Sequence, residues 1–439
     1  MTGTQLNRMF EPHSMTLQER RARALGPAYR LFYREPVHVV RGSGTRLFDI
    51  DGVEYLDAYN NVPAVGHCHP RVVEAQYRQA ATLNTHTRYL GTDLVDYAER
   101  LLATFPAPLA NVMFTCTGSE AIDLALRVAR HRRPGTGVVV TENAYHGTTA
   151  AAAAISPSLG GFAPLGTDVR VVPAPHRFPA DEVDTAFPAA VRAAIDDLGR
   201  HGHGVAAFVA DSIFASDGVI PGPTGFLRGA AEAVRAAGGV YIADEVQPGF
   251  GRLGTGMWGF ARHGVEPDMV VLGKPMGNGM PIAATVVRPE LLAAFGSEIR
   301  YFNTFGGNPV AIAAADAVLD VIDDENLIAN AERVGAHLRT ELRRLTADCP
   351  FIGEVRGAGL FLGLDVLDEH GRPDAAATDL VINTFRDERV LVGSAGLGST
   401  AVKVRPPLPF SMDDADRLLE VTERVLTVLV RDQGKDAAR

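Results

Sequence analysis

The chain has 439 residues, 46% of them apolar and 21% charged, which is the balance of a globular protein long enough for more than one domain. Its formal charge of −10 and the lack of a basic stripe argue against binding to nucleic acid or to an anionic membrane. Three scattered cysteines argue against a disulfide framework, and no signal peptide or membrane-spanning run of about 18 apolar residues is recognisable, so we expect a cytoplasmic protein.

The first predicted element is a β-hairpin near the N-terminus. Residues 37–41 and 47–50 have the pattern of strands, and a Gly-Ser-Gly turn lies between them. A second turn follows at Asp51-Gly52. Residues 36–57 are therefore expected to form antiparallel β structure.

Strand-like and helical patterns alternate through the middle of the chain. The predicted strands are short runs of Val, Ile and Ala that are apolar on both faces, as expected of buried parallel strands. They cover residues 137–141, 205–211, 239–244, 269–273 and 282–287. Between them lie amphipathic stretches such as 119–130, where Ile122, Leu126 and Ala129 fall on one helical face. This alternation predicts an α/β fold with a large, mostly parallel sheet.

The C-terminal part has a different pattern. A long helix is expected at residues 331–347, short strands around 354–364, and a final helix from 413 to about 430. We expect a large α/β domain at residues 60–330. A smaller α+β domain would be formed by both chain ends, residues 1–59 and 331–439.

An aspartate and a lysine at two strand ends predict the central chemistry. Asp244 closes one apolar strand and Lys274 follows another, and ligands of an open parallel sheet bind beyond the carboxyl ends of its strands. Pyridoxal chemistry needs this pair, because a lysine must form the imine and shuttle protons while a carboxylate keeps the pyridine nitrogen protonated. Taken alone, such residues are more often a buried strand-end carboxylate and a surface lysine.

Three neighbouring segments strengthen the interpretation. Thr117-Gly118-Ser119-Glu120 opens a helix, and the free N–H groups of a helix start beside a glycine can bind phosphate, although a merely capped helix has the same pattern. Ala144-Tyr145-His146-Gly147 follows a strand and offers an aromatic plane for a ring, although Tyr145 alone would more often be a core residue. Residues 302–309 form a polar, glycine-rich loop that suggests close approach to a ligand.

Together these segments resemble the class III aminotransferases, a family of fold-type I pyridoxal-phosphate enzymes. The resemblance runs from Asp51-Gly52 to Lys403-Val404-Arg405-Pro406-Pro407, which is nearly the whole chain. Its most specific motifs are Ala-Asp-Glu-Val-Gln-Pro-Gly-Phe-Gly-Arg at 243–252 and Gly-Lys-Pro-Met-Gly-Asn-Gly-Met-Pro at 273–281. The resemblance implies pyridoxal 5'-phosphate as the cofactor and the fold-type I architecture.

The resemblance also implies roles for individual residues. Lys274 would carry the cofactor as a Schiff base, and Asp244 would bond the pyridine nitrogen. The other implied cofactor contacts are Gln247 at the phenolic oxygen, Tyr145 and Val246 on the two faces of the ring, His146 beside Tyr145, and Gly118 and Ser119 at the phosphate. Thr304 would reach the phosphate from a second subunit, which implies a homodimer with shared active sites.

Two histidines around a cysteine, in Gly66-His67-Cys68-His69-Pro70, have the look of a metal site. A structural zinc site needs four spaced ligands, and no partner pair is visible elsewhere in the sequence. The segment is common in this family, which binds no metal there, so we expect no metal.

Two departures from the family pattern concern the substrate. Many amino-acid transaminases of this class have a glutamate–arginine gate, in which the arginine binds the substrate carboxylate. The matching positions here are Ser216 and Lys403. An arginine grips a planar carboxylate through two hydrogen bonds, whereas a lysine is a compact charge that suits a tetrahedral phosphate. The alternative is that Lys403 only ends a strand or pairs on the surface.

The exchange agrees with a resemblance to the ethanolamine-phosphate phospho-lyase branch of the family, carried by residues 60–70, 87–90, 303–308 and Lys403-x-x-Pro-Pro. These enzymes eliminate phosphate. Lys274 would take a proton from the carbon that bears nitrogen, and phosphate on the adjacent carbon would leave, so that an aldehyde and ammonia result. The candidates for binding the phosphorylated amine are Lys403 first, and then Arg405, Arg88, Asn60 and Asn61.

Other functions stay open at this point. An ω-aminotransferase that moves an amino group to a 2-oxo acid would keep every cofactor residue and differ only in its substrate contacts. A cofactor-binding protein without catalysis is disfavoured by the intact lysine and ring contacts. For a lyase, ethanolamine phosphate, O-phosphothreonine and phosphohydroxylysine are all compatible with the sequence.

Overall fold

The computed structural model describes residues 15–131 and 135–436, with side chains to residue 433. Residues 15–38 belong to a separate N-terminal unit. Its helix α1 (Leu17–Leu25) begins after Thr16, whose hydroxyl accepts the N–H of Glu19 while the Glu19 carboxylate accepts the N–H of Thr16. This reciprocal capping satisfies two N–H groups at the helix start.

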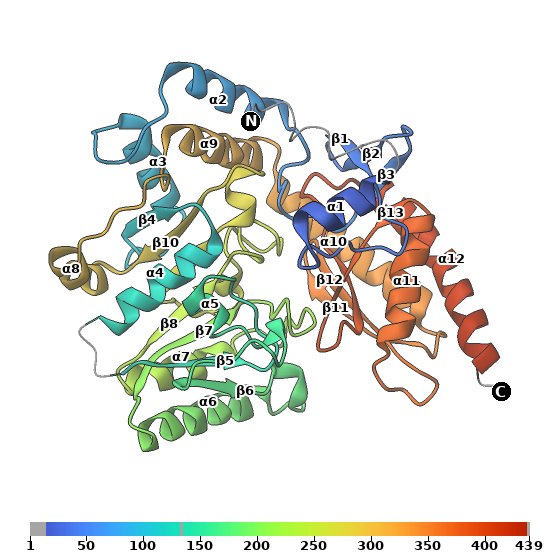
Figure 1. Cartoon of the computed structure of the whole chain (residues 1–439). Coiled ribbons are helices and arrows are strands. Elements are labelled where there is room, and N and C mark those ends of the chain that lie inside the picture. The colour runs from blue at the N-terminus through green and yellow to red at the C-terminus, as the bar shows by residue number, and fades with distance from the viewer. Residues whose placement is uncertain (1–14, 132–134, 437–439) are drawn as a thin grey trace, which may run out of the picture. The chain divides into compact units, whose positions relative to one another are not determined.

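The second unit starts at Val39, and the largest sheet described in it has seven strands, with helices on both sides (Figure 1). Its strand order is β4-β10-β9-β8-β7-β5-β6. The strands are β4 (Asn111–Thr115), β5 (Gly137–Thr141), β6 (Val169–Val172), β7 (Val205–Asp211), β8 (Val240–Asp244), β9 (Met269–Leu272) and β10 (Ala283–Val287). The predicted α/β fold with a large, mostly parallel sheet is confirmed. All five predicted strands are present, and the two edge strands β4 and β6, which are partly exposed, were not predicted.

One strand contradicts the expectation of parallel pairing. β10 runs antiparallel to both β9 and β4, whereas β9, β8, β7, β5 and β6 pair in parallel. The chain passes from β9 to β10 through the short 3-10 helix η5 (Lys274–Gly277) without a crossover helix. Parallel neighbours need a long crossover, so this short connection makes the pair antiparallel. The same connection holds Lys274 at the end of the sheet.

Helices pack on both faces of the sheet, which explains why its strands are apolar on both sides. Val209 faces the core that contains the apolar residues of α4. Its neighbour Phe208 points to the opposite face and contacts Phe187 of α6. The helices of this region are α4 (Gly118–Arg130), α5 (Ala150–Ala153), α6 (Val183–Arg200), α7 (Leu227–Ala236) and α8 (Pro289–Glu298), with the 3-10 helices η2 (Pro157–Leu159), η3 (Pro175–Arg177) and η4 (Gly259–His263).

Both ends of the second unit meet in a small sheet. Its strands are β1 (Val39–Ser43), β2 (Arg46–Asp49), β3 (Glu54–Asp57) and β13 (Val390–Leu391). The first three are antiparallel, as predicted, and β13 pairs in parallel with β3. This pairing agrees with a domain made from both chain ends, although the boundaries expected at residues 60 and 330 stay a prediction.

A third sheet and six helices complete the unit. The sheet has the order β11-β12-β15-β14, formed by β11 (Ile352–Ala358), β12 (Phe361–Val366), β14 (Gly393–Ala395) and β15 (Ala401–Val404). The helices are α2 (Pro70–Thr82), α3 (Thr92–Leu102), α9 (Pro309–Asp324), α10 (Leu327–Thr346), α11 (Ala375–Asp387) and α12 (Met412–Asp436). α10 and α12 are the two predicted C-terminal helices, and both are longer than predicted.

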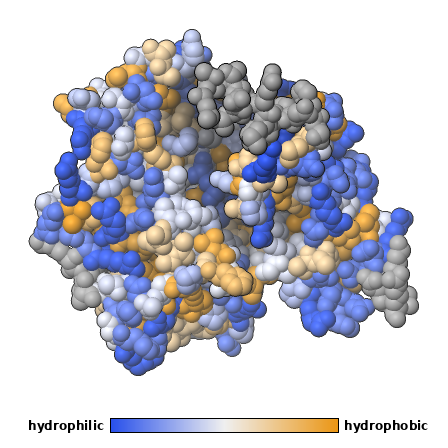
Figure 2. Space-filling view, viewed as in Figure 1, coloured by the Kyte–Doolittle hydropathy of each residue, from blue (hydrophilic) through white to orange (hydrophobic). Residues whose placement is uncertain are grey.

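The two histidines of the segment at residues 66–70 each lie beside a carboxylate. Figure 2 shows polar and apolar residues interspersed on the viewed face. His67 Nε2 lies 2.6 Å from Asp57 Oδ2, and His69 Nε2 lies 3.0 Å from Glu325 Oε1. Within the described ranges, no group of three His, Cys, Asp or Glu side chains is arranged to hold a metal ion. In the same part of the chain, no helix has both the length and the apolar character to cross a membrane.

Candidate active site

The carboxyl ends of β8 and β9 border a cavity of about 200 Å³. Asp244 ends β8, pairs with Val271 of β9, and faces the same cavity as Lys274, which follows β9. The cavity is lined by Thr117, Gly118, Ser119, Tyr145, His146, Gly147, Asp244, Val246, Gln247 and Lys274. Every predicted cofactor residue except Thr304 therefore lies around one cavity, as the strand-end argument predicted.

A phosphate cradle lies at the start of α4. Thr117 caps this helix, accepting the N–H of Glu120 at 3.2 Å. A Cβ at Gly118 would lie 3.0 Å from Val246 Cγ2, and one at Gly147 would overlap Ser119 Oγ. Glycine is therefore required at position 147 and fits best at position 118, and the backbone stays open beside a helix N-terminus, where the N–H groups attract an anion.

Asp244 is held in place from two sides. His146 Nδ1 lies 2.7 Å from its Oδ2, and the N–H of Val246 donates to its Oδ1 at 3.1 Å. The other ring nitrogen, His146 Nε2, is buried and has no hydrogen-bond partner among the described residues. A carboxylate fixed in this way can hold a protonated ring nitrogen in one orientation.

A second carboxyl group, which the sequence analysis did not identify, lies next to Asp244. Asp211 ends β7 in register with Asp244 of β8, and it lines a smaller adjoining cavity with Tyr145 and His146. Burial, reinforced by the charge of Asp244, raises the pKa of Asp211 to about 7. The strand-end argument that found Asp244 applies equally to Asp211, so the signal was present in the sequence.

Lys274 combines an unusual backbone with a buried amine. Its φ is +24°, in a region that residues other than glycine rarely adopt and that is often found at functional sites. Burial and the nearby Arg405 charge lower the pKa of Lys274, while Asp244 and Asp211 partly oppose them. A lysine with a lowered pKa is more often unprotonated at neutral pH, as a nucleophile or base must be.

Arg405 and Lys403 bring positive charge to the edge of this site. Arg405 Nη1 donates to Gln247 Oε1, and its guanidinium lies 5.4 Å from the centre of the Tyr59 ring. Lys403 makes no ion pair with a carboxylate in the described ranges, and burial, Arg405 and Lys274 lower its pKa well below the usual value. Repulsion from Arg405 contributes to the lowered pKa of both lysines, and an anionic ligand beside them would offset this repulsion.

The gate position opposite these cations carries no carboxylate. The backbone carbonyl of Ser216 accepts the side-chain N–H of Asn143 at 2.5 Å and the N–H of Gly396 at 3.1 Å. The next residue, Asp217, accepts hydrogen bonds from the Thr141 hydroxyl and the Asn143 N–H instead. Lys403 therefore has no partner of the kind that a glutamate at position 216 would provide.

The remaining substrate candidates lie in different settings. The Asn60 side chain accepts the N–H of Val62 at 3.0 Å and so shapes its own turn. Both amide atoms of Asn61 are buried and have no hydrogen-bond partner in the described part of the chain. No observation places either amide in the cavity of Lys274, so their predicted contacts stay predictions.

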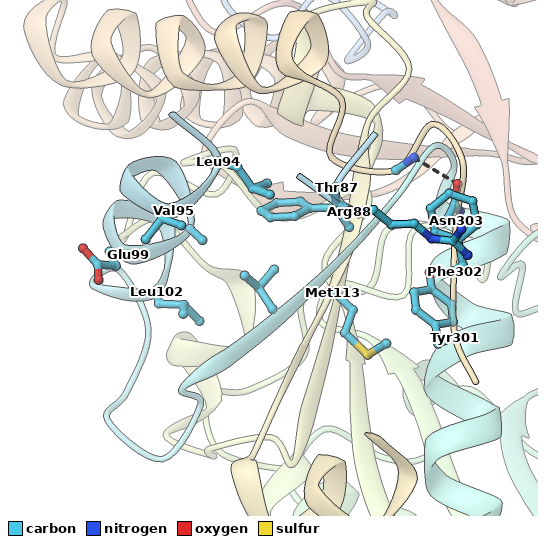
Figure 3. A pocket seen from close by; sticks show the side chains of 14 residues that line it. Thr87, Arg88, Leu94, Val95, Glu99, Leu102, Met113, Tyr301, Phe302 and Asn303 are labelled. Atoms are coloured by element: carbon cyan, nitrogen blue, oxygen red, sulfur yellow. Dashed lines mark hydrogen bonds between the residues drawn. The ribbon is translucent and has the colours of Figure 1, made fainter. Parts of the chain in front are cut away.

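Arg88 and Thr304 do not line the cavity of their own chain. The Arg88 guanidinium lies 3.9 Å from the centre of the Phe302 ring, in a pocket of about 480 Å³ between α3, β4 and residues 301–306 (Figure 3). Figure 3 shows the Arg88 side chain reaching toward Phe302 and Asn303. Thr304 follows them in the same loop and is exposed.

The residues present fit pyridoxal phosphate. The helix start offers N–H groups to a phosphate, Asp244 offers a carboxylate to a ring nitrogen, and Tyr145 and Val246 offer apolar surfaces to a flat ring. Lys274 offers the amine for a covalent link. Among the described residues that line the cavity, His146 Nε2 is the one buried side-chain polar atom without a hydrogen-bond partner. The contacts named above do not give it one.

Comparisons with known proteins agree with this site. The family model "Aminotransferase class-III" matches residues 32–426. The chain is 41% identical to an alanine–glyoxylate aminotransferase 2-like protein of Drosophila melanogaster, over 93% of this chain and 86% of that protein. It is 37% identical to ethanolamine-phosphate phospho-lyase homolog 1 of Caenorhabditis elegans, over 94% and 93% of the two chains.

A solved structure gives the same result. A phospholyase from Arthrobacter in complex with phosphoethanolamine matches with a TM-score of 0.90 and 44% identity, over 94% of this chain and 99% of that chain. The resemblance inferred from the motifs is thus confirmed, together with its fold type and its cofactor. This chain belongs to the class III aminotransferase family and is a pyridoxal-phosphate-dependent enzyme of fold type I.

Proposed function

We propose that this enzyme is a phospho-lyase that eliminates phosphate from a small phosphorylated amine. The observation that carries the proposal is the exchange of charge at the gate, where Lys403 and Ser216 replace an arginine and a glutamate. Lys403 lies near Arg405 on the same aromatic ring, and no carboxylate pairs with Lys403 within the described ranges. The names of two relatives, a phospho-lyase homolog and a phospholyase, support the same reaction.

The cofactor would be held by the cavity residues. Lys274 would bind it through the amine, Asp244 at the ring nitrogen, and Gly118 and Ser119 at the phosphate. The family resemblance implies that Tyr145, Val246 and Gln247 would contact the ring, and their places around the cavity support this. When bound, pyridoxal phosphate supplies an electron-accepting ring that stabilises negative charge on the carbon next to the substrate nitrogen.

Lys274 would move the proton. The substrate amine would first take the place of Lys274 on the cofactor, and the freed Nζ, whose pKa burial lowers, would then take the proton from the carbon that bears the substrate nitrogen. Asp244, oriented by His146, would keep the ring nitrogen protonated while this charge develops. These two groups serve a lyase and a transaminase equally, so the choice between the two reactions depends on the substrate contacts.

Lys403 and Arg405 would bind the leaving phosphate. Donors placed where negative charge develops stabilise the transition state, and a phosphate bonded to two cations is a better leaving group. A tetrahedral phosphate offers oxygens in several directions, which suits a lysine beside an arginine that is already fixed by Gln247. Once phosphate leaves, the remaining enamine hydrolyses to an aldehyde and ammonia.

A homodimer would complete the site through Thr304. This residue is exposed in the loop that borders the pocket of Figure 3. The next residue, Phe305, is 69% exposed, and Leu90 is 105% exposed two residues after Arg88, whose guanidinium lies over the Phe302 ring of this loop. Apolar exposure of this kind is typical of a surface that another protein covers. We propose a second copy of this chain as that protein, with Thr304 reaching the partner's cofactor phosphate.

Mixing two inactive variants tests the shared site. Lys274→Ala removes the base from one cavity, and Thr304→Asp places a negative charge at the proposed phosphate contact of the other. If sites are shared across a homodimer, mixed dimers contain one cavity with both native residues, and about a quarter of the wild-type activity should return after unfolding and refolding together. Refolded mixtures that stay inactive, although dimers form, would contradict the sharing.

The first experiment measures phosphate release from cofactor-loaded enzyme given phosphoethanolamine without an amino acceptor. We expect phosphate, ammonia and acetaldehyde in equal amounts. Lys403→Met should lower kcat/KM about 10- to 100-fold, the loss expected for a charge-assisted hydrogen bond, and Arg424→Met, on the exposed side of α12, should not. Absence of release with phosphoethanolamine, phosphothreonine and phosphohydroxylysine would refute the proposal.

The second candidate function is an ω-aminotransferase. The alanine–glyoxylate aminotransferase 2-like relative favours it, because its 41% identity over 93% of this chain exceeds the 37% of the phospho-lyase homolog. Amino transfer to pyruvate, glyoxylate or 2-oxoglutarate, without phosphate release, would establish it. The cytoplasmic location expected from the sequence stays a prediction in either case.

A further inference from the structure

Lys403 lies between two glycines in its sheet. On β15 it pairs with Gly363 of β12 on one side and with Gly393 of β14 on the other. Residues directly opposite one another on antiparallel strands place their side chains on the same face. No side chain therefore flanks Lys403 on either neighbouring strand, and other parts of the protein can approach it closely.

Tyr59 fills the space over one of these glycines. A Cβ at Gly393 would overlap Cε2 of the Tyr59 ring, so the ring fits only because residue 393 is glycine. On the other flank, a Cβ at Gly363 would lie 2.9 Å from the carbonyl oxygen of Gly218, which stands two residues after Ser216 at the gate position. The Lys403 side chain is thus walled by an aromatic ring on one side and by the gate backbone on the other.

The Tyr59 ring also contacts both substrate-site cations. Lys403 Nζ lies 5.6 Å from its centre and the Arg405 guanidinium 5.4 Å, both within the range of a cation–π interaction. Arg405 Nε donates to the Tyr59 carbonyl at 3.4 Å, and its side chain hydrogen-bonds the Tyr59 side chain. In the described ranges neither cation forms an ion pair with a carboxylate. The buried Asp211 acts on both from a longer distance, and the Tyr59 ring is the negative surface that lies within contact range of both.

We infer that Tyr59 is a positioning residue for the phosphate subsite, whose ring keeps Lys403 and Arg405 together when no phosphate is bound. Burial and Arg405 already lower the pKa of Lys403, so without the ring its amine would hold a proton still less readily and would turn away from Arg405. The inference rests on the proposed phospho-lyase function, because it assumes that these cations bind phosphate. It adds a residue that the motifs did not indicate.

The test measures binding of inorganic phosphate to the cofactor-loaded enzyme, from the change in cofactor absorbance and from competitive inhibition. Tyr59→Leu should weaken phosphate binding about tenfold, or about 1.4 kcal/mol, while the cofactor stays bound. Tyr59→Phe, which keeps the ring, should restore most of the affinity. If Tyr59 only filled space, Tyr59→Leu and Tyr59→Phe would change the thermal stability, and their phosphate affinities would not differ from each other.

Gly393→Ala gives a second route to the same displacement. Its methyl group would push the ring away from Lys403 and should reproduce the weaker phosphate binding. Because both changes act through one ring, the double variant Tyr59→Leu with Gly393→Ala should bind phosphate no more weakly than Tyr59→Leu alone. Additive losses would mean that Gly393 acts on something else and would overturn the ring argument.

The outcomes separate this inference from the proposed function. If Lys403→Met weakens phosphate binding and Tyr59→Leu does not, the role of Tyr59 is wrong and the phospho-lyase proposal stands. If Tyr59→Leu weakens phosphate binding but the wild type releases no phosphate from any phosphoamine, the subsite is an anion site of another reaction. If wild-type enzyme does not bind phosphate at millimolar concentration, both ideas fail.

Discussion

Replacing Glu245 with glutamine tests how the loop after Asp244 is held. The Glu245 side chain is fully buried and accepts the Ser212 hydroxyl and the N–H groups of Phe260 and Gly259, the last at 2.7 Å. Burial is the main cause that raises its pKa from 4.5 to about 7, and Asp211 adds to the effect. A folded state that holds this proton more tightly than the unfolded chain is favoured at low pH.

The magnitude follows from this difference in pKa. Below about pH 4.5 the contribution of Glu245 to stability is complete, and it is lost as the pH rises through about 7, by about 1.4 kcal/mol per pH unit and about 3 kcal/mol in total. Glutamine does not titrate, but its NH2 group and the Gly259 N–H are both hydrogen-bond donors. Placing them opposite each other lowers the free energy of unfolding by about 2 kcal/mol at every pH. Wild type should therefore be the more stable protein at pH 5 and the less stable one at pH 8.

Thermal unfolding of the two proteins from pH 5 to 8 measures this crossover. For a chain of this length, a change of about 3 kcal/mol moves Tm by about 3 °C. Glu420→Gln, on an exposed side of α12, removes a carboxylate without burial and should follow the wild-type curve. A constant Tm difference between wild type and Glu245→Gln would mean that Glu245 is ionised throughout and would refute the reasoning.

Three further predictions concern the cofactor. Gly118→Ala places a Cβ 3.0 Å from Val246 Cγ2 and should weaken cofactor binding about 10-fold, through overpacking of about 1–2 kcal/mol. The control Gly199→Ala has no atom within 4 Å of its new Cβ and should not weaken binding. Fluorescence titration of cofactor-free protein measures both. Lys274→Ala should abolish turnover and the imine absorbance, while equilibrium dialysis still detects bound cofactor; substantial residual turnover would contradict its role. Tyr145→Leu should weaken cofactor binding about 5- to 10-fold by loss of stacking, and Tyr145→Phe should not; equal dissociation constants would place the ring elsewhere.

The residues around the cofactor cavity could be predicted because each has a local signal. Asp244 and Lys274 end or follow apolar strands, and Thr117 to Glu120 have the pattern of a capped helix start. The rule that ligands bind at the carboxyl ends of parallel strands then placed them together. Two further points were within reach of the same reasoning but were missed: Asp211 also ends a strand, and the short link after β9 indicates antiparallel pairing.

Other features depend on contacts that leave no local signal. Tyr59 reaches Lys403 only because a glycine stands at position 393 of a third segment, and neither residue has a motif of its own. Arg88 was a substrate candidate by resemblance, whereas the structure stacks it on Phe302 in a separate pocket. Such placements result from tertiary packing between distant segments, which periodicity and spacing do not report.

The parallel pairing of β3 with β13 has a consequence for biosynthesis. Leu56 meets Val390 across more than 300 residues of chain, so β3 stays without this neighbour until almost the whole protein has left the ribosome. Long-range pairings of this kind form slowly, and an unpaired strand edge can join a wrong partner in the meantime. Tyr59 lies two residues after β3, and Lys403 lies on β15, further along the chain than β13. The part of the enzyme that holds these two residues would therefore be among the last to fold.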